Sequence, residues 1–260
     1  MSTFVLIHGA WHGGWVWGHV ARLLRTQGHN VHTPDLPGHG GDKTPVGEVT
    51  LQAYADRVAE VIDACAEPVL LAGHSMGGVV ISQAAEQRAE RVSALVYVCA
   101  FLLRDNECLL QWAEPDRDGL VVPNLEFSTD GKSATIKMEA ILQAFYGDCQ
   151  AEDAKQMQSL LVPQATAPLS TAVHLTNGKY GKIPRFYVEC LHDRAISISI
   201  QRQMYAAAGC KKVFTLDCDH SPMYSRPTEL VNCLIEAAEL SRLPGNERYS
   251  PFRQKKKAGL

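Results

Sequence analysis

The chain has 260 residues, of which 46% are hydrophobic and 20% charged, and its formal net charge is -3. This balance is typical of globular proteins and provides no basic surface of the kind that binds nucleic acid. No apolar run approaches the roughly 20 residues that cross a bilayer, and the first residues lack the regions of a signal peptide. We therefore expect a soluble, cytoplasmic protein with neither nucleic acid nor membrane as a partner.

The eight cysteines show no metal-binding or disulfide pattern. They stand at positions 65, 99, 108, 149, 190, 210, 218 and 233, without a CxxC pair. Structural zinc sites are recognised by short spacings between cysteine and histidine ligands, and these are missing here. We expect reduced thiols, no metal site and no cofactor.

Strand and helix patterns alternate along the first 98 residues. Short apolar runs are typical of buried strands, and apolar residues at helical spacing follow them. This alternation predicts a parallel sheet with helices on both faces, an α/β fold. The expected elements are strands at Phe4–Ile7, Val31–Thr33, Val69–Ala72 and Ala94–Val98, with helices from Val16 to Gly28, after the N-cap Thr50, and from about Met76 to Gln87.

The alternation is interrupted once. Residues 102–183 carry helical patterns around Ile136–Phe145 and Ala154–Leu161, which indicate an inserted helical lid. The strand and helix rhythm then resumes, so residues 1–240 are expected to form one domain, followed by a loose basic tail at 241–260. The later elements are strands Arg185–Cys190 and Val213–Leu216, a helix near Ile198–Ala208 stopped by Gly209, and a helix after Pro227.

The strongest chemical signal is the sequence Gly73-His74-Ser75-Met76-Gly77. It follows a buried strand directly and precedes a helix, which is the context of a nucleophile elbow of the G-x-S-x-G type. A tight turn of this kind strains the serine backbone and exposes its hydroxyl. We predict that Ser75 is a nucleophile.

A serine nucleophile needs a base and a carboxylate that orients the base. His220 lies between the last expected strand and the last helix, and Asp193 follows the preceding strand. The order Ser75, Asp193, His220 predicts a catalytic triad. Asp217 and Asp219 remain alternatives to Asp193, whereas His192 cannot supply a carboxylate.

Five further residues are candidates for the substrate site. The backbone amides of Ala10 and Met76 could stabilise an oxyanion, because each would lie beside the nucleophile at a strand end. Trp11 adjoins this loop and is a candidate pocket residue. Phe145 and Leu161 in the lid are also candidates, although packing within the lid explains them better.

These motifs resemble those of the α/β-hydrolase subgroup that contains plant methyl esterases, hydroxynitrile lyases and bacterial esterases such as pyrethroid hydrolases. The resemblance runs from about Phe4 to Leu240 and includes the segments at residues 4–10, 73–78, 187–193 and 219–223. It implies an α/β-hydrolase fold, a mostly parallel doubly wound sheet with an inserted lid. It also implies the triad Ser75, Asp193 and His220.

Two positions depart from the lyase branch of this subgroup. The resemblance implies threonine in the oxyanion loop and lysine just after the histidine for a lyase, and here these positions hold Gly9 and Ser221. We therefore expect a serine carboxylesterase that forms an acyl-enzyme on Ser75. A lyase or other enzyme that cleaves carbon–carbon bonds, and a receptor without turnover, are the alternatives. The expected partners are a small-molecule ester and, at most, a second copy of the chain in a homodimer.

Overall fold

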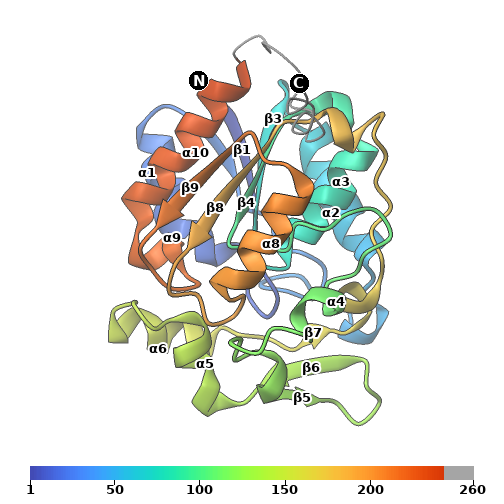
Figure 1. Ribbon diagram of the computed structural model, residues 1–260, viewed down its shortest axis with the longest axis vertical. Helices are drawn as coiled ribbons and strands as arrows, with labels where there is room; N and C mark the ends of the chain where they lie inside the picture. The colour runs from blue at the N-terminus through green and yellow to red at the C-terminus, as the bar shows by residue number, and fades with distance from the viewer. Residues whose placement is uncertain (243–260) are drawn as a thin grey trace, which may run out of the picture.

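The computed structural model describes residues 1–242, and a six-stranded sheet forms its centre (Figure 1). The strand order is β2-β1-β3-β4-β8-β9, and every neighbouring pair is parallel. All six residues of β3 are buried, as expected for a continuous apolar run covered on both faces. The strands are β1 Thr3–Ile7, β2 Asn30–His32, β3 Val69–His74, β4 Val92–Val98, β8 Arg185–Cys190 and β9 Lys212–Leu216.

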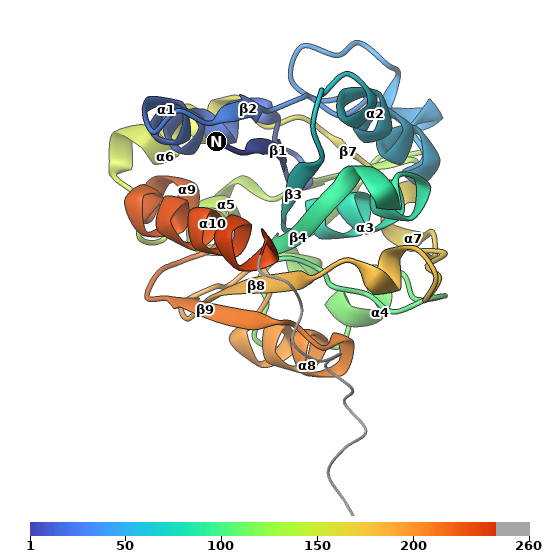
Figure 2. The same cartoon turned by 90° about the horizontal axis from the view of Figure 1, so that it is seen from above.

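Helices cover both faces of this sheet, as the alternating sequence pattern predicts (Figure 2). Phe4 and Leu6 of β1 belong to the core beneath α1 and α10, whereas Val5 and Ile7 belong to the core beneath α2, α3 and α8. The predicted N-cap is present, since the Thr50 hydroxyl accepts a hydrogen bond from the Ala53 amide. The helices are α1 Gly18–Thr26, α2 Leu51–Asp63, α3 Gly77–Gln87, α8 Ile198–Ala208, α9 Pro222–Ser225 and α10 Pro227–Arg242.

The segment between β4 and β8 forms a cap at one end of the molecule (Figure 1). It contains the two expected helices, but it also holds a three-stranded antiparallel sheet in the order β5-β6-β7. The sequence analysis, which predicts a helical lid, did not anticipate this sheet. The turn that joins β5 to β6 contains Gly131 at φ +68°. The cap elements are α4 Leu110–Ala113, β5 Leu125–Phe127, β6 Ser133–Ile136, α5 Met138–Phe145, α6 Ala151–Ser159, β7 Gln164–Ala165 and α7 Ala167–Ser170.

Short 3-10 helices complete the connections, and no helix within residues 1–242 is long and apolar enough to span a membrane. The last helix continues through Arg242, beyond the expected domain end at residue 240. The rest of the expected basic tail, residues 243–260, lies outside the described residues. The 3-10 helices are η1 Gly14–Trp17, η2 Val46–Glu48, η3 Ala89–Arg91, η4 Val122–Asn124 and η5 Tyr180–Lys182.

The strand register brings the predicted site together. Ile7 of β1 pairs with Gly73 of β3, so the loop after β1 starts beside the turn after β3. Because all strands run the same way, the segments after β8 and β9, which carry Asp193 and His220, leave the sheet at the same edge. This is the edge at which open α/β sheets bind their ligands.

Candidate active site

Ser75 occupies the turn between β3 and α3 in a strained conformation. Its φ is +55°, which is unfavourable for a residue with a side chain. The neighbouring glycines allow the close packing that imposes this turn: a Cβ on Gly77 would lie 2.7 Å from the Ile7 carbonyl oxygen, and one on Gly73 would lie 2.5 Å from that of Gly77. These features match the predicted nucleophile elbow.

Asp193 and His220 form a buried hydrogen-bonded pair. Asp193 Oδ2 lies 2.7 Å from His220 Nδ1, and both side chains are almost fully buried. Burial raises the pKa of Asp193, and the attraction of His220 opposes this change. The other carboxylate oxygen, Oδ1, accepts the backbone amides of Ala195 and Ile196 at 2.7 and 2.8 Å, which orients the group.

Gln201 of α8 also supports the carboxylate, and the sequence offered no signal for this role. Its side-chain amide donates to Asp193 Oδ2 at 3.0 Å and to the backbone carbonyl of Ile196 at 2.8 Å. Gln201 is fully buried. Its amide is therefore placed to hold Asp193 in one orientation.

The two alternative aspartates do not contact the His220 ring. Asp217 is exposed and lies 3.1 Å from His192 Nε2. Asp219 stabilises its own loop instead, accepting hydrogen bonds from the Ser221 amide and the Ser225 hydroxyl. The geometry thus favours Asp193 as the partner of the histidine.

Within residues 1–242, neither Ser75 Oγ nor His220 Nε2 forms a hydrogen bond. Ser75 lines a cavity. The ring centroids of Phe145, which lines the same cavity, and His220 are 5.7 Å apart. A serine and its base often form their hydrogen bond only when substrate is bound. Ser75 and His220 can therefore act as a nucleophile and its base, although their hydrogen bond is not formed in this conformation.

Two free backbone amides lie next to the nucleophile, one in the loop after β1 and one at the start of α3. In the described part of the chain, the backbone N–H groups of Ala10 and Met76 donate to no acceptor. The loop lies very close to the elbow, since a Cβ on Gly9 would be 2.8 Å from Ser75 Cβ. Both amides are thus free to donate, and their binding of an oxyanion stays a prediction.

Trp11 connects this loop to the cap. Its φ is +63°, and its amide donates to Gln164 Oε1 at 3.4 Å while its carbonyl accepts from the Val162 amide at 3.0 Å. Gln164 is fully buried and also donates to the Tyr54 hydroxyl at 3.1 Å. The sequence analysis did not identify Gln164. It lies in a strand of only two residues, and its partners are too distant in sequence for any local pattern to indicate them.

The cavity is small and mostly apolar. It has a volume of about 40 Å³. Four other predicted residues line it with Ser75, namely Ala10, Trp11, Met76 and Phe145, whereas Leu161 does not. Leu161 packs against the hydrophobic core from a partly buried position, so the structure does not place it in the pocket. Side chains of the cap must move before a substrate larger than a few atoms can enter.

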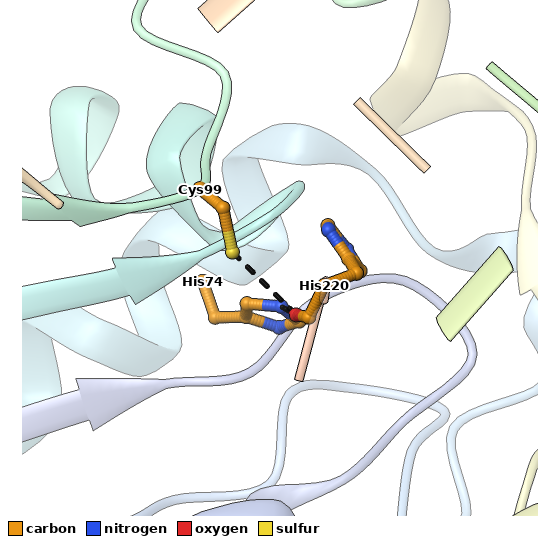
Figure 3. A group of neighbouring side chains, drawn as sticks. All are labelled: His74, Cys99 and His220. Carbon is orange, nitrogen blue, oxygen red and sulfur yellow. Dashed lines mark hydrogen bonds between the residues drawn. The ribbon is translucent and has the colours of Figure 1, made fainter. Parts of the chain in front are cut away.

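His220 and two buried neighbours, His74 and Cys99, form a group that could bind a metal ion (Figure 3). One donor atom of each side chain is already engaged. His74 Nε2 and Cys99 Sγ lie 2.8 and 3.5 Å from the His220 carbonyl oxygen, and His220 Nδ1 contacts Asp193. The group therefore fits a hydrogen-bonded support for His220 better than a ligand set.

Comparison with known proteins supports the predicted resemblance. The chain is 32% identical over 248 residues to a pyrethroid hydrolase of Sphingobium wenxiniae, covering 92% of this chain and 88% of that protein. It is 31% identical to methylesterase 7 of Arabidopsis thaliana, over 92% of this chain and 96% of that protein. A crystal structure of polyneuridine aldehyde esterase superimposes with a TM-score of 0.84 at 27% identity, covering 92% and 99% of the two chains.

The family model described as the alpha/beta hydrolase family matches residues 4–232, from β1 into the last helix. The observed sheet, elbow and inserted cap agree with this match. The chain therefore belongs to the alpha/beta hydrolase family.

Proposed function

We propose that the chain is a serine carboxylesterase that hydrolyses small-molecule esters through an acyl-enzyme on Ser75. The observation that carries the proposal is the buried hydrogen bond of 2.7 Å between His220 Nδ1 and Asp193. It selects the tautomer whose Nε2 can accept a proton from a serine hydroxyl. The similarity to a pyrethroid hydrolase and to methylesterases supports ester hydrolysis as the reaction class.

In the first half of the reaction, Ser75 Oγ forms a bond to the ester carbonyl carbon while its proton moves to His220 Nε2. The tetrahedral intermediate collapses, the bond to the alcohol oxygen breaks, and His220 returns the proton to that oxygen. Asp193 stays ionised and stabilises the imidazolium. In the second half, a water molecule loses a proton to His220 while its oxygen attacks the acyl carbon. The bond from that carbon to Ser75 Oγ then breaks, His220 returns the proton to Oγ, and the acid is released.

The oxyanion of both intermediates would bind to the amides of Ala10 and Met76. These donors belong to the backbone of two packed loops, so they need little reorganisation during the reaction. Loss of one such donor typically costs a factor of about 10² to 10³ in kcat.

The cavity lining favours substrates with an apolar acyl or alcohol group. Its side chains include Phe101, Leu109, Leu169 and Ile196, and Asp116 is its one charged residue within the described chain. The volume of about 40 Å³ is far below the 300 Å³ or more of a typical ligand pocket. We expect small esters to require less displacement of the cap side chains than larger ones.

The lyase alternative receives less support. Gly9 stands where the lyases would have threonine, and a Cβ there would lie 2.8 Å from Ser75 Cβ. Ser221 provides no cation to stabilise a leaving cyanide. The experiment described next also tests for carbon–carbon bond cleavage.

The test is a rapid-mixing assay with p-nitrophenyl acetate, followed by a series of esters of increasing acyl size. An esterase that accumulates an acyl-enzyme releases a burst of p-nitrophenol close to one equivalent per chain, then reaches a slower steady state. Cyanide release from mandelonitrile without ester turnover would assign the lyase reaction instead. Saturable binding without either product would indicate a receptor.

A further inference from the structure

The backbone carbonyl of His220 accepts hydrogen bonds from two neighbouring side chains, His74 and Cys99 (Figure 3). The donors are His74 Nε2 at 2.8 Å and Cys99 Sγ at 3.5 Å. His74 is the last residue of β3, and Cys99 directly follows β4. The loop that carries the histidine is thus attached to the two strands at the centre of the sheet.

The hydrogen bond defines the state of the His74 ring. A carbonyl oxygen can only accept, so Nε2 carries the hydrogen. Burial lowers the pKa of His74 well below its usual range, and the adjacent His220 lowers it further, so the ring is neutral. Nδ1 is then a bare acceptor.

This Nδ1 is buried and has no hydrogen-bond partner among residues 1–242. Buried nitrogen atoms without a partner are uncommon and unfavourable. An apolar side chain of similar volume would fill the space without that penalty. The presence of histidine therefore points to a use for its other nitrogen, the donor to His220.

Neutrality of His74 also suits a neighbouring base. The centroids of the His74 and His220 rings are 4.5 Å apart. A charged ring at this distance would oppose the imidazolium that forms on a general base during catalysis. A neutral ring holds the backbone without that repulsion.

We propose that His74 is a positioning residue for the general base: its Nε2–H fixes the backbone of His220 while Asp193 fixes the ring. This inference rests on the proposed function, in which His220 transfers the proton. A displacement of about 1 Å in a reacting group can cost a factor of about 10² in rate. One hydrogen bond to the carbonyl of His220 can therefore affect turnover strongly.

The test compares His74→Leu with His74→Gln. Leucine removes the donor, whereas the glutamine side chain carries an N–H at a similar reach. We expect His74→Leu to lower kcat about 10²-fold with little change in KM, and His74→Gln to restore most of the loss. The control is Ser82→Ala, which removes two other buried hydrogen bonds, to the Gly78 carbonyl and to the Tyr97 hydroxyl, both at 2.8 Å, and should leave kcat unchanged.

A second readout does not depend on turnover. The proton between His220 Nδ1 and Asp193 should give a strongly downfield resonance in the NMR spectrum of the full chain. We expect this resonance to shift or broaden in His74→Leu and to return in His74→Gln. If the wild-type chain hydrolyses no ester, the proposed function fails, yet the resonance still tests whether His74 positions His220.

Three results would overturn the inference. The first is an unchanged kcat and resonance in His74→Leu. The second is an equal loss in His74→Leu and His74→Gln, because ring shape rather than the donor would then matter. The third concerns the case in which His74→Leu does not fold. His74→Asn then replaces it, because the asparagine amide is too short to reach the carbonyl of His220. A kcat of His74→Asn equal to that of His74→Gln would overturn the inference.

Discussion

Trp11 donates a hydrogen bond of 2.8 Å from its indole N–H to the backbone carbonyl of Ala134, which ties the loop after β1 to strand β6 of the cap. Together with the contacts of the Trp11 backbone, this bond makes the cap part of the support for the candidate oxyanion site. The inserted segment is therefore attached at the site itself and not only at its two ends.

Replacing Trp11 by Phe should destabilise the chain through this bond, because the Ala134 carbonyl loses its donor inside the protein. The matched control is Trp17→Phe, since Trp17 Nε1 is buried without a partner in the described chain. Both changes reduce volume, but only the first breaks a hydrogen bond. We expect the free energy of unfolding to fall by about 1 to 2 kcal/mol more for Trp11→Phe than for the control, measured by urea denaturation. Equal losses would show that the bond contributes nothing.

Asp193→Asn should lower kcat by about 10³ to 10⁴, because the amide no longer selects the His220 tautomer that accepts the serine proton. A reactive fluorophosphonate should still label Ser75, since the nucleophile and the backbone donors remain. Asp217→Asn is the control, because Asp217 is exposed and pairs with His192. A fully active Asp193→Asn and an inactive Asp217→Asn would show that Asp217, and not Asp193, is the carboxylate that orients His220.

The stability of the chain should fall between pH 6.5 and pH 4. Burial lowers the pKa of four of the buried histidines, His8, His12, His39 and His74, and that of His12 from 6.5 to about 4. Each stays neutral in the folded chain, whereas it gains a proton in the unfolded chain below pH 6.5. Their contribution is therefore fully present above pH 6.5 and is lost as the pH falls toward the folded-state pKa.

The size of this effect can be checked one residue at a time. His12 should add about 1.4 kcal/mol per pH unit to the slope of the unfolding free energy, which gives about 3 kcal/mol across its window from pH 6.5 to about 4. Urea denaturation at several pH values should show a shallower slope in His12→Gln than in the wild type. An identical slope would mean that His12 is protonated in the folded chain.

Chelation by EDTA should leave ester hydrolysis unchanged. The proposed mechanism uses a serine, an imidazole, a carboxylate and two backbone amides, and the buried group His74, Cys99 and His220 is held by hydrogen bonds. The assay compares initial rates before and after dialysis against EDTA. Loss of activity that zinc restores would require a metal in the reaction.

Much of this architecture was predictable because its signals are local. The elbow is encoded by Gly73, Ser75 and Gly77 within five residues, and the start of α2 by the single N-cap Thr50. The cap was harder to predict, since β5 and β7 have only three and two residues and show no measurable alternation. Gln164 and Gln201 could not be predicted for another reason. Gln164 contacts residues that are distant in sequence, Gln201 contacts Asp193 of the site, and a single buried amide produces no sequence pattern that indicates its partners.

The central claim is that Ser75 becomes acylated. Its most direct test is mass spectrometry of the full chain quenched during the burst with p-nitrophenyl acetate, followed by peptide mapping, with Ser75→Ala alongside. We predict one acetyl group on the peptide that contains Ser75, and in Ser75→Ala no acetyl group and a kcat lower by about 10⁴ to 10⁶ with an unchanged unfolding transition. A folded Ser75→Ala chain that hydrolyses the ester at the wild-type rate would contradict the account.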